Sequence, residues 1–285
     1  MIHNINSMID KKFLDKVEKC KLDLIYRMDD LINRSYQAMS DSCGLLPNYN
    51  DDEEIWRYMN MSKFIALLEC KKIHLTRLDI FDDLFEAHYP IVDYDRHFSQ
   101  MLDIDWSIVD LKRDHRNLME LLKQGWFYVN CWHVNSVESY AMWNIYTTKS
   151  EGIAIKTTIG KLKQSIKSQL RIFYSKISYL DYNNESLIEY QMSCRQKGVL
   201  IHPFPAFYKE KSYEYEKEFR VAFMNNPFID KTNDSHKAID VNLDTLIEEI
   251  YISPYAGKWF RDLIEKVVKR YKLNAPIQQS RIMLK

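Results

Sequence analysis

The chain has 285 residues, of which 46% are hydrophobic and 28% charged, so it can bury one large core or two smaller ones and is not a disordered chain. Its 40 basic and 40 acidic residues cancel, so no global field draws it toward a polyanion, although a local patch still could. Its five cysteines contain no C-x-x-C pair, which argues against a disulfide framework and a zinc ribbon.

The first residues lack the apolar run of a secretory signal, and no stretch approaches about 18 consecutive apolar residues. We therefore expect a cytoplasmic protein that does not enter a membrane. Six glycines are few for this length, and neither G-x-x-x-x-G-K nor G-x-G-x-x-G occurs, so no glycine-rich phosphate loop is expected.

Residues Asp10–Met39 predict one long amphipathic helix, because apolar residues recur at three- and four-residue spacings. Its apolar stripe needs a partner, which could be the rest of the chain, a second copy in a homodimer, or a regulatory protein. The Gly- and Pro-containing segment Ser40–Asn50 predicts a linker. The expected organisation is an N-terminal helix and linker over residues 1–50 and a main domain over residues 51–285.

The main domain is predicted to begin with a strand, a helix and a second strand: Ile55–Met59, Lys63–Glu69 with Ser62 as its N-cap, and Lys72–Thr76. A polar helix over Asp93–Gln124, a strand over Trp126–Trp132, a helix from a Ser136 cap through Tyr146, and a strand over Gly152–Thr158 are expected next. Residues 161–205 mix helix and strand signals. The expected C-terminal elements are a strand in KEFRVAF, a polar turn over Asn225–His236, a strand over Glu249–Ser253, a helix over Ala256–Arg270 and a short strand near Ile277–Arg281.

The most informative segment is KSYEYEKEFRVAF, Lys211–Phe223, where apolar residues alternate with polar ones at the period of a half-buried strand. The spacing predicts that Glu216 and Glu218 share one strand face, about 7 Å apart, where they could share a ligand or raise each other's pKa. The alternative is a solvent-exposed strand edge on which Lys217 and Arg220 neutralise the two acids.

Arg57 lies in a predicted strand among aromatic residues, so its charge must reach solvent, pair with an acid in the core, or enter a polar cavity. In such a cavity its planar fork would suit a phosphate. Further along the chain, Tyr140, Trp143 and Tyr146 fall on one helix face, either as core or as a surface on which a nicotinamide or a base stacks. His133 is either a catalytic imidazole or a hydrogen-bonded structural residue.

No metal site is expected. The eight histidines contain no H-x-x-x-H pair, and the acids in RLDIFDDLFEA lack the glycine and terminal glutamate spacing of an EF-hand. Asp79 and Asp82 are better explained as turn formers and helix caps.

Four segments in this order resemble the bacterial family known as domain of unknown function 2971: Ile55–Ala87, Asn130–Thr158, Ser212–Phe223 and Glu248–Ser280. The resemblance covers roughly Glu54–Ser280. The order of elements is also similar to the ADP-ribosyltransferase superfamily, especially its DNA-modifying branch. Residue by residue, Arg57 matches the Arg or His on the first core strand of that superfamily. Trp132 to Trp143 match its aromatic-polar strand and helix in the middle of the chain, and Glu218 matches its glutamate on a late strand.

The resemblance implies an α+β, ADP-ribosyltransferase-like fold with a mixed or antiparallel sheet, flanking helices and the N-terminal amphipathic helix. It implies NAD as a substrate and no metal. Glu218 would stabilise an oxocarbenium-like charge, and Glu216 would orient the acceptor or act as general base. The implied cofactor-binding residues are Arg57 for the diphosphate, Tyr58, Thr76, Arg77 and Trp132 along the cavity, and Trp143 or Tyr146 against the nicotinamide.

The expected function is therefore an NAD-dependent ADP-ribosyltransferase-like enzyme that modifies a macromolecule, nucleic acid or protein, in the manner of a toxin or a phage-defence effector. Two alternatives stay open at this point. One is a catalytically inactive binding or sensing module of the same fold. The other is a nuclease that uses Asp82, Asp83, Glu216 and Glu218 with magnesium.

Overall fold

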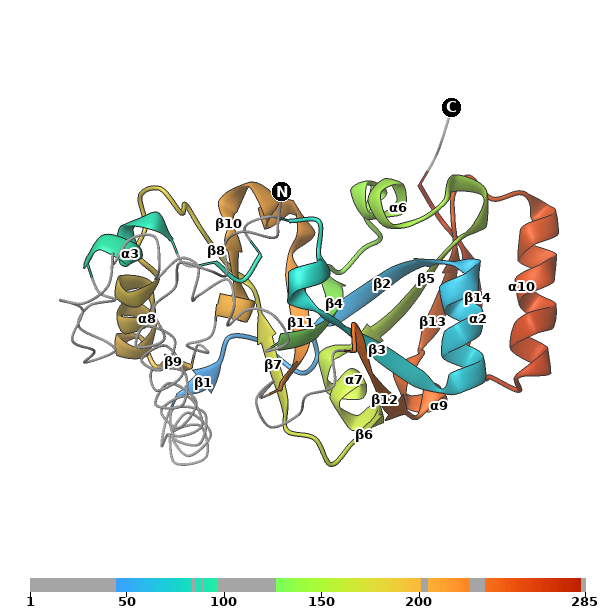
Figure 1. Cartoon of the computed structure of the whole chain (residues 1–285). Coiled ribbons are helices and arrows are strands. Elements are labelled where there is room, and N and C mark those ends of the chain that lie inside the picture. The colour runs from blue at the N-terminus through green and yellow to red at the C-terminus, as the bar shows by residue number, and fades with distance from the viewer. Residues whose placement is uncertain are drawn as a thin grey trace, which may run out of the picture. The chain divides into compact units, whose positions relative to one another are not determined.

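The computed structural model describes residues 45–83, 86–88, 90–96, 127–200, 205–225 and 234–282 (Figure 1). Contacts divide the chain into two units, Met1–Leu46 and Pro47–Lys285, and nearly all described residues belong to the second. The predicted helix Asp10–Met39, residues 40–44 of the predicted linker, the predicted helix beyond Arg96 and most of the Asn225–His236 turn lie outside the described residues.

A large mixed sheet forms the centre of the second unit. Its strands run in the order β14–β13–β5–β2–β4–β3–β12–β6, and β11 joins β4 to β7. These strands are β2 (Glu54–Asn60), β3 (Lys72–Arg77), β4 (Phe127–Val134), β5 (Gly152–Thr158), β6 (Ile166–Lys167), β7 (Ile172–Lys176), β11 (Glu218–Met224), β12 (His236–Val241), β13 (Glu249–Ile252) and β14 (Ile277–Gln279). All pairs are antiparallel except β13 with β14.

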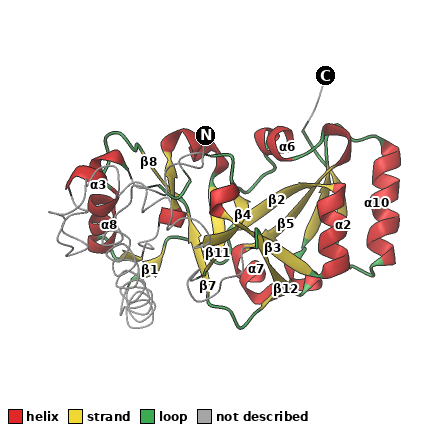
Figure 2. Ribbon diagram, viewed as in Figure 1, coloured by secondary structure: helices red, strands yellow, loops and turns green. Residues whose placement is uncertain are grey.

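Short strands and helices complete the described chain (Figure 2). The other strands are β1 (Leu46–Pro47), β8 (Ser178–Leu180), β9 (Val199–Leu200) and β10 (Tyr208–Glu210), of which β8 and β10 pair in parallel. The helices are α2 (Met61–Cys70), α3 (Ile91–Arg96), α6 (Tyr140–Tyr146), α7 (Ile159–Ser165), α8 (Leu187–Gln196), α9 (Leu243–Leu246) and α10 (Lys258–Arg270). The predicted α+β class with a mixed sheet and flanking helices is confirmed. Within the described segments, no helix has the length and apolarity to span a membrane.

One apolar core lies between the sheet and the helices that cover it. Phe64 and Leu68 of α2 and Phe260 and Ile264 of α10 are fully buried in the same cluster as the isoleucines of β5 and β13. Burying a side chain of this size stabilises a fold by about 1.5–3 kcal/mol. The α10 pattern of buried positions four residues apart is the amphipathic pattern that predicts it from the sequence.

Three helices start elsewhere than predicted, and one of them is α10, which begins at Lys258 rather than Ala256. Strand β2 runs directly into α2, so Asn60 precedes the helix and Ser62 lies inside it. Helix α6 begins after Ser139, whose side chain accepts a hydrogen bond from the Met142 N–H, so the Ser136 cap was wrong. Several Ser and Asn residues near a helix start can cap it, and the preceding strand or loop decides which one is in place.

The segment before β11 is not a strand. Lys211–Glu216 forms a 3-10 helix, η5, and Lys217 follows it with φ 41° and ψ 53°, in the left-handed region. Glu216 therefore lies on η5 and Glu218 at the start of β11, and the prediction that they share one strand face was wrong. The left-handed turn at Lys217 changes the direction of the chain between the two acids.

The left-handed Lys217 gives a stability test. Substitution Lys217→Val should lower the free energy of unfolding by about 1–2 kcal/mol, because a β-branched residue fits this region poorly. Substitution Lys217→Gly should change it by less than about 1 kcal/mol, because relief of the backbone strain offsets the extra freedom of the unfolded chain. Urea unfolding of both variants measures the difference, and equal stability of Val and Gly at this position would contradict the turn.

Candidate active site

The sheet forks at β4. Strand β11 pairs with β4 along nearly the whole of one edge. The other edge is shared, since β3 pairs with Tyr128 and Val129 and β2 pairs with His133 and Val134. Residues 130–132 have no strand partner on that edge. Helix α2 connects β2 to β3.

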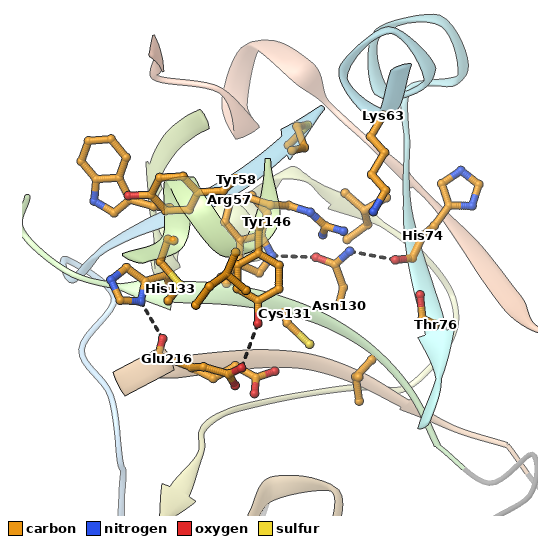
Figure 3. A pocket seen from close by; sticks show the side chains of 18 of the residues that line it. Arg57, Tyr58, Lys63, His74, Thr76, Asn130, Cys131, His133, Tyr146 and Glu216 are labelled. Atoms are coloured by element: carbon orange, nitrogen blue, oxygen red, sulfur yellow. Dashed lines mark hydrogen bonds between the residues drawn. The ribbon is translucent and has the colours of Figure 1, made fainter. Parts of the chain in front are cut away.

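A cavity of about 900 Å³ lies at this fork (Figure 3). Its volume is within the usual range of small-molecule and cofactor sites, about 300–1,000 Å³. Every predicted site residue except Arg77 and Trp143 lines it: Arg57, Tyr58, Thr76, Trp132, Tyr146, Glu216 and Glu218. The expectation that Arg57 and Glu218 border one cleft agrees with this lining, and the chemical roles of these residues stay predictions.

The two predicted residues that do not line the cavity have structural partners instead. The Nε atom of Arg77 lies 2.6 Å from Asp79 Oδ1, in an ion pair near the end of β3. Trp143 is fully buried behind the cavity wall, with its ring edge-on to Tyr58 at a centroid distance of 5.0 Å. Of the two aromatics proposed for the nicotinamide, only Tyr146 reaches the cavity.

Arg57 enters the cavity from β2 and has no acidic partner among the residues that the structure describes. The residue is half-buried, its Nη1 atom is buried without a hydrogen-bond partner among these residues, and its guanidinium lies 5.7 Å from the centre of the Trp132 ring. Burial lowers the pKa of Arg57 to about 10, because the charge loses hydration and gains no compensating carboxylate. The core salt bridge considered from the sequence is therefore not formed within the described residues. A guanidinium held this way can bind an anion such as a phosphate.

Asn130 was not among the predicted site residues, yet it holds the fork together. Its Nδ2 donates to the His74 carbonyl oxygen of β3 at 2.8 Å, and its Oδ1 accepts from Trp132 Nε1 at 2.7 Å. The side chain thus replaces a backbone contact where β3 and β4 have separated. It also orients the Trp132 ring against Arg57.

Arg220 joins two carboxylates at the opposite end of the cavity. It is fully buried on β11 and donates to Glu218 at 2.7 and 3.0 Å and to Glu86 at 2.7 and 3.0 Å. It also donates to the Ala206 carbonyl oxygen at 2.7 Å. Burial alone would raise the pKa of Glu218, but Arg220 and Lys209 hold it below the ordinary value. The alternative of a solvent-exposed strand edge is excluded.

Lys209 lies at the centre of the acidic end and was missed from the sequence. Its ammonium is 2.8 Å from Glu216, 3.6 Å from Glu86, and 3.9 Å from both Asp83 and Glu218. Burial would lower the pKa of Lys209, but the surrounding carboxylates, Glu218 first, raise it above the ordinary value. Nothing in the local pattern YKEK marks this lysine, because Asp83 and Glu86 come from a distant segment and Glu216 and Glu218 reach it only through the turn at Lys217.

Glu216 has a distinct hydrogen-bond environment from Glu218. Its Oε1 accepts from the Tyr146 hydroxyl at 2.8 Å and its Oε2 accepts from Lys209 Nζ at 2.8 Å. Its carbonyl oxygen lies 2.6 Å from His133 Nδ1, which must therefore carry the proton. The Nε2 atom of His133 is buried without a partner, and burial lowers the pKa of this imidazole. Each oxygen of Glu216 retains one lone pair for a ligand.

The two ends of the cavity are lined by side chains of opposite charge. Arg57, Lys63 and Lys72 line it toward α2 and β3, together with His74 and His236. Asp83, Glu216 and Glu218 line it toward η5 and β11. Such a cavity suits a ligand that carries an anionic group at one end and a cationic group at the other.

Among the described residues, no set of three or more His, Cys, Asp or Glu side chains is arranged to hold a metal ion. A physical reason is visible in the acidic end, where the ammonium of Lys209 lies among Asp83, Glu86, Glu216 and Glu218. The position that a divalent cation would need is already occupied by a positive charge.

Comparison with protein families gives one match. Residues 142–221 match the model of the family described as "Protein of unknown function (DUF2971)". This confirms the expected resemblance, over a shorter span than the predicted Glu54–Ser280. The part that matches DUF2971 contains Tyr146, Lys209, Glu216, Glu218 and Arg220 of the acidic end, whereas Asp83 and Glu86 lie outside it. A comparison with curated proteins finds no match.

Three similar solved structures are of DarT from Thermus sp. 2.9, in complex with carba-NAD+, with ADP-ribosylated ssDNA and with NAD+. They share 11%, 11% and 9% identity with this chain and cover 82%, 83% and 81% of it and 97% of the DarT chain. The TM-scores are 0.36, 0.36 and 0.37. At this distance the ligands belong to DarT alone, so function has to be argued from the cavity.

The Arg220 pairing gives a stability prediction. Substitution Arg220→Met should lower the free energy of unfolding by about 3–5 kcal/mol, because it leaves Glu86 and Glu218 buried without their main counter-charge. Arg220→Lys keeps the charge but loses the fork, so it should recover only part of the loss. The control is Arg261→Met, which breaks a surface pair with Glu265 and should cost less than about 1 kcal/mol. Chemical unfolding of the three variants tests this, and a tolerated Arg220→Met would contradict it.

The lowered pKa of Glu218 gives a pH prediction. A carboxyl whose pKa is lower in the folded protein stabilises the fold above its unfolded pKa and loses that contribution as the pH falls through the folded value. The free energy of unfolding should therefore decrease below about pH 4, and Glu218→Gln should flatten part of the decrease. Urea unfolding between neutral and acidic pH measures both slopes. Identical slopes would show that Glu218 does not carry this linkage.

Proposed function

We propose that the cavity binds NAD and transfers its ADP-ribosyl group to a macromolecular acceptor. The observation that carries the proposal is that a half-buried arginine, Arg57, and two buried glutamates, Glu216 and Glu218, line opposite ends of one cavity of cofactor size. Among the described residues, Arg57 has no acidic partner, and its Nη1 atom is buried without a hydrogen bond. NAD has a matching distribution of charge, since its diphosphate is anionic and its nicotinamide ring is cationic. The resemblance to the ADP-ribosyltransferase superfamily supports the same assignment of Arg57 and Glu218.

At the basic end, Arg57 would bind the diphosphate, and Lys63 on α2 would supply a second positive charge. Both residues line the cavity, and together they match the two negative charges of a diphosphate. The Trp132 ring below Arg57 fixes the guanidinium from one side. Lys63 was not among the predicted site residues, because a lysine on an exposed helix face usually interacts only with solvent.

At the acidic end, transfer breaks the bond between ribose C1′ and the nicotinamide nitrogen. The bonding electron pair leaves with the nicotinamide, and positive charge develops on the ribose. Glu218, held in one orientation by Arg220, would stabilise this charge more in the transition state than in the ground state. The acceptor forms the new bond to C1′, and Glu216 would orient it and accept its proton. Tyr146 would pack against the nicotinamide.

A non-catalytic binding or sensing module is the second candidate, and one observation favours it. Both oxygens of Glu218 already accept hydrogen bonds from Arg220, so the glutamate could serve the fold alone. The metal-dependent nuclease is disfavoured by the Lys209 ammonium among the acids it would use. Incubation with NAD separates the candidates, because a transferase releases free nicotinamide, a binding module binds NAD without release, and a nuclease requires magnesium and DNA or RNA.

The sharpest test uses Arg57, whose loss should move binding and stability in opposite directions. Substitution Arg57→Met should weaken NAD binding at least about tenfold, since a charge-assisted hydrogen bond contributes about 1.5–3 kcal/mol. It should leave the melting temperature unchanged or raise it, because it removes a half-buried charge that has no acidic partner among the described residues. Calorimetric titration and thermal unfolding of the same protein measure both quantities.

The matched control is Arg261→Met, which removes a surface arginine far from the cavity lining and should change neither quantity appreciably. Nicotinamide release with and without protein or nucleic-acid acceptors then tests the transferase step. If Arg57→Met binds NAD normally and unfolds at lower temperature, Arg57 serves the fold and the proposal fails.

A further inference from the structure

We infer that Glu138 and the C-terminal residues Ser280–Ile282 form a clamp that positions α6, and through it Tyr146, against Glu216. Glu138 lies in the loop before α6 and Ser280 lies directly after β14. The inference concerns a positioning role for residues outside the cavity. Only the predicted effect of the clamp on catalysis rests on the proposed function.

The clamp is built on one carboxylate. Glu138 Oε2 accepts from Ser280 Oγ at 2.5 Å and from Trp143 Nε1 at 3.0 Å, and its Oε1 accepts from the Arg281 N–H at 2.6 Å. The Ile282 N–H donates to Ser280 Oγ at 3.2 Å. One side chain therefore connects a residue inside α6 with two consecutive residues of the C-terminal segment, Ser280 and Arg281, and this segment passes close to α6 in Figure 1.

The C-terminal segment is itself fixed to the sheet. The Ser280 N–H donates to the Ile252 carbonyl oxygen at 3.0 Å, and Gln279 Nε2 donates to the Ser253 carbonyl oxygen at 2.9 Å. Strand β14, which precedes it, pairs with β13. Through Ser280, the clamp thus fixes the position of α6 relative to the sheet.

Helix α6 depends on such external support. It has seven residues, too few for an isolated helix to be stable, and buries only Met142 and Trp143. These two side chains pack in a small cluster with Trp56, Tyr58 and Ala154, against which Ile282 also packs. The Tyr58 hydroxyl accepts from the Ser139 N–H at 2.7 Å, so the same cluster positions a residue of the cavity wall.

The other end of α6 reaches the acidic end of the cavity. Tyr146, the last residue of α6, donates to Glu216 Oε1 at 2.8 Å, and Ile145 also lines the cavity. A shift of α6 would break the Tyr146–Glu216 hydrogen bond and leave Lys209 as the one described partner of the Glu216 carboxylate. Glu138 therefore acts on Glu216 from a distance, through Trp143 and Tyr146.

Hydrogen–deuterium exchange on the full chain tests the clamp without any ligand. In Glu138→Ala, amides of residues 140–147 should exchange at least about tenfold faster, which corresponds to about 1.4 kcal/mol of local stability. Amides of residues 211–217 should also exchange faster, because η5 loses its contact with Tyr146. Ser280→Ala should reproduce part of both effects, and Ser280→Thr, which keeps the hydroxyl, should not. The control is Glu248→Ala, which removes a surface carboxylate paired with Lys161.

Unchanged exchange over residues 211–217 in Glu138→Ala would overturn the inference, whether or not the protein uses NAD. If the amides of residues 211–217 exchange as fast in Ser280→Thr as in Ser280→Ala, the role of the Ser280 hydroxyl in the clamp is overturned. If the wild-type chain releases nicotinamide, Glu138→Ala should lower kcat more than it raises KM, since Arg57 and the basic end stay intact. A wild-type chain that binds and cleaves no NAD overturns the proposed function and leaves the exchange experiment decisive for the clamp.

Discussion

The candidate site depends first on the buried guanidinium of Arg220. It connects Glu218 on β11, Glu86 from the segment before α3 and the Ala206 carbonyl oxygen before β10, which are far apart in the sequence. Taken alone, each buried acid would be costly, and the fork of hydrogen bonds makes their burial tolerable. With Asp83, Glu216 and Lys209 included, four carboxylates face two cations and leave a formal charge of minus two. That excess charge favours a cationic group in the adjoining cavity.

The basic end of the cavity differs from the acidic end in how its charge is compensated. Arg57 is half-buried beside Trp132 with no compensating carboxylate in the described part of the chain, and its lowered pKa records the cost of the lost hydration. Structures seldom retain such a group for stability alone. Arg57 therefore favours ligand binding but lowers stability, whereas Arg220 favours both.

The fork of the sheet brings the two ends into one cavity. A continuous sheet would cover residues 130–132 of β4 with backbone contacts and leave no cavity. Because β2 and β3 pair with different ends of β4, side chains from both strands enter the gap between them. Asn130 closes part of the gap by its hydrogen bond to the His74 carbonyl oxygen. Polar side chains thus replace backbone pairing where a ligand has to enter.

Periodicity and residue type in the sequence determined the strands around Arg57, Trp132 and Glu218, the C-terminal helix predicted over Ala256–Arg270, and the candidacy of Arg57 and Glu218 as site residues. These features are local, since alternation and three- to four-residue spacing act over a few residues. The family resemblance added the α+β class. Only the tertiary structure decided that Glu216 lies off the strand, that Trp143 lies behind the cavity, and that Lys209, Glu86 and Asn130 belong to the site. Each of these depends on contacts between segments distant in the chain or on a left-handed turn at a lysine. A local sequence pattern carries no information about which charged residues from distant segments will pair. In this protein those pairings define the cavity.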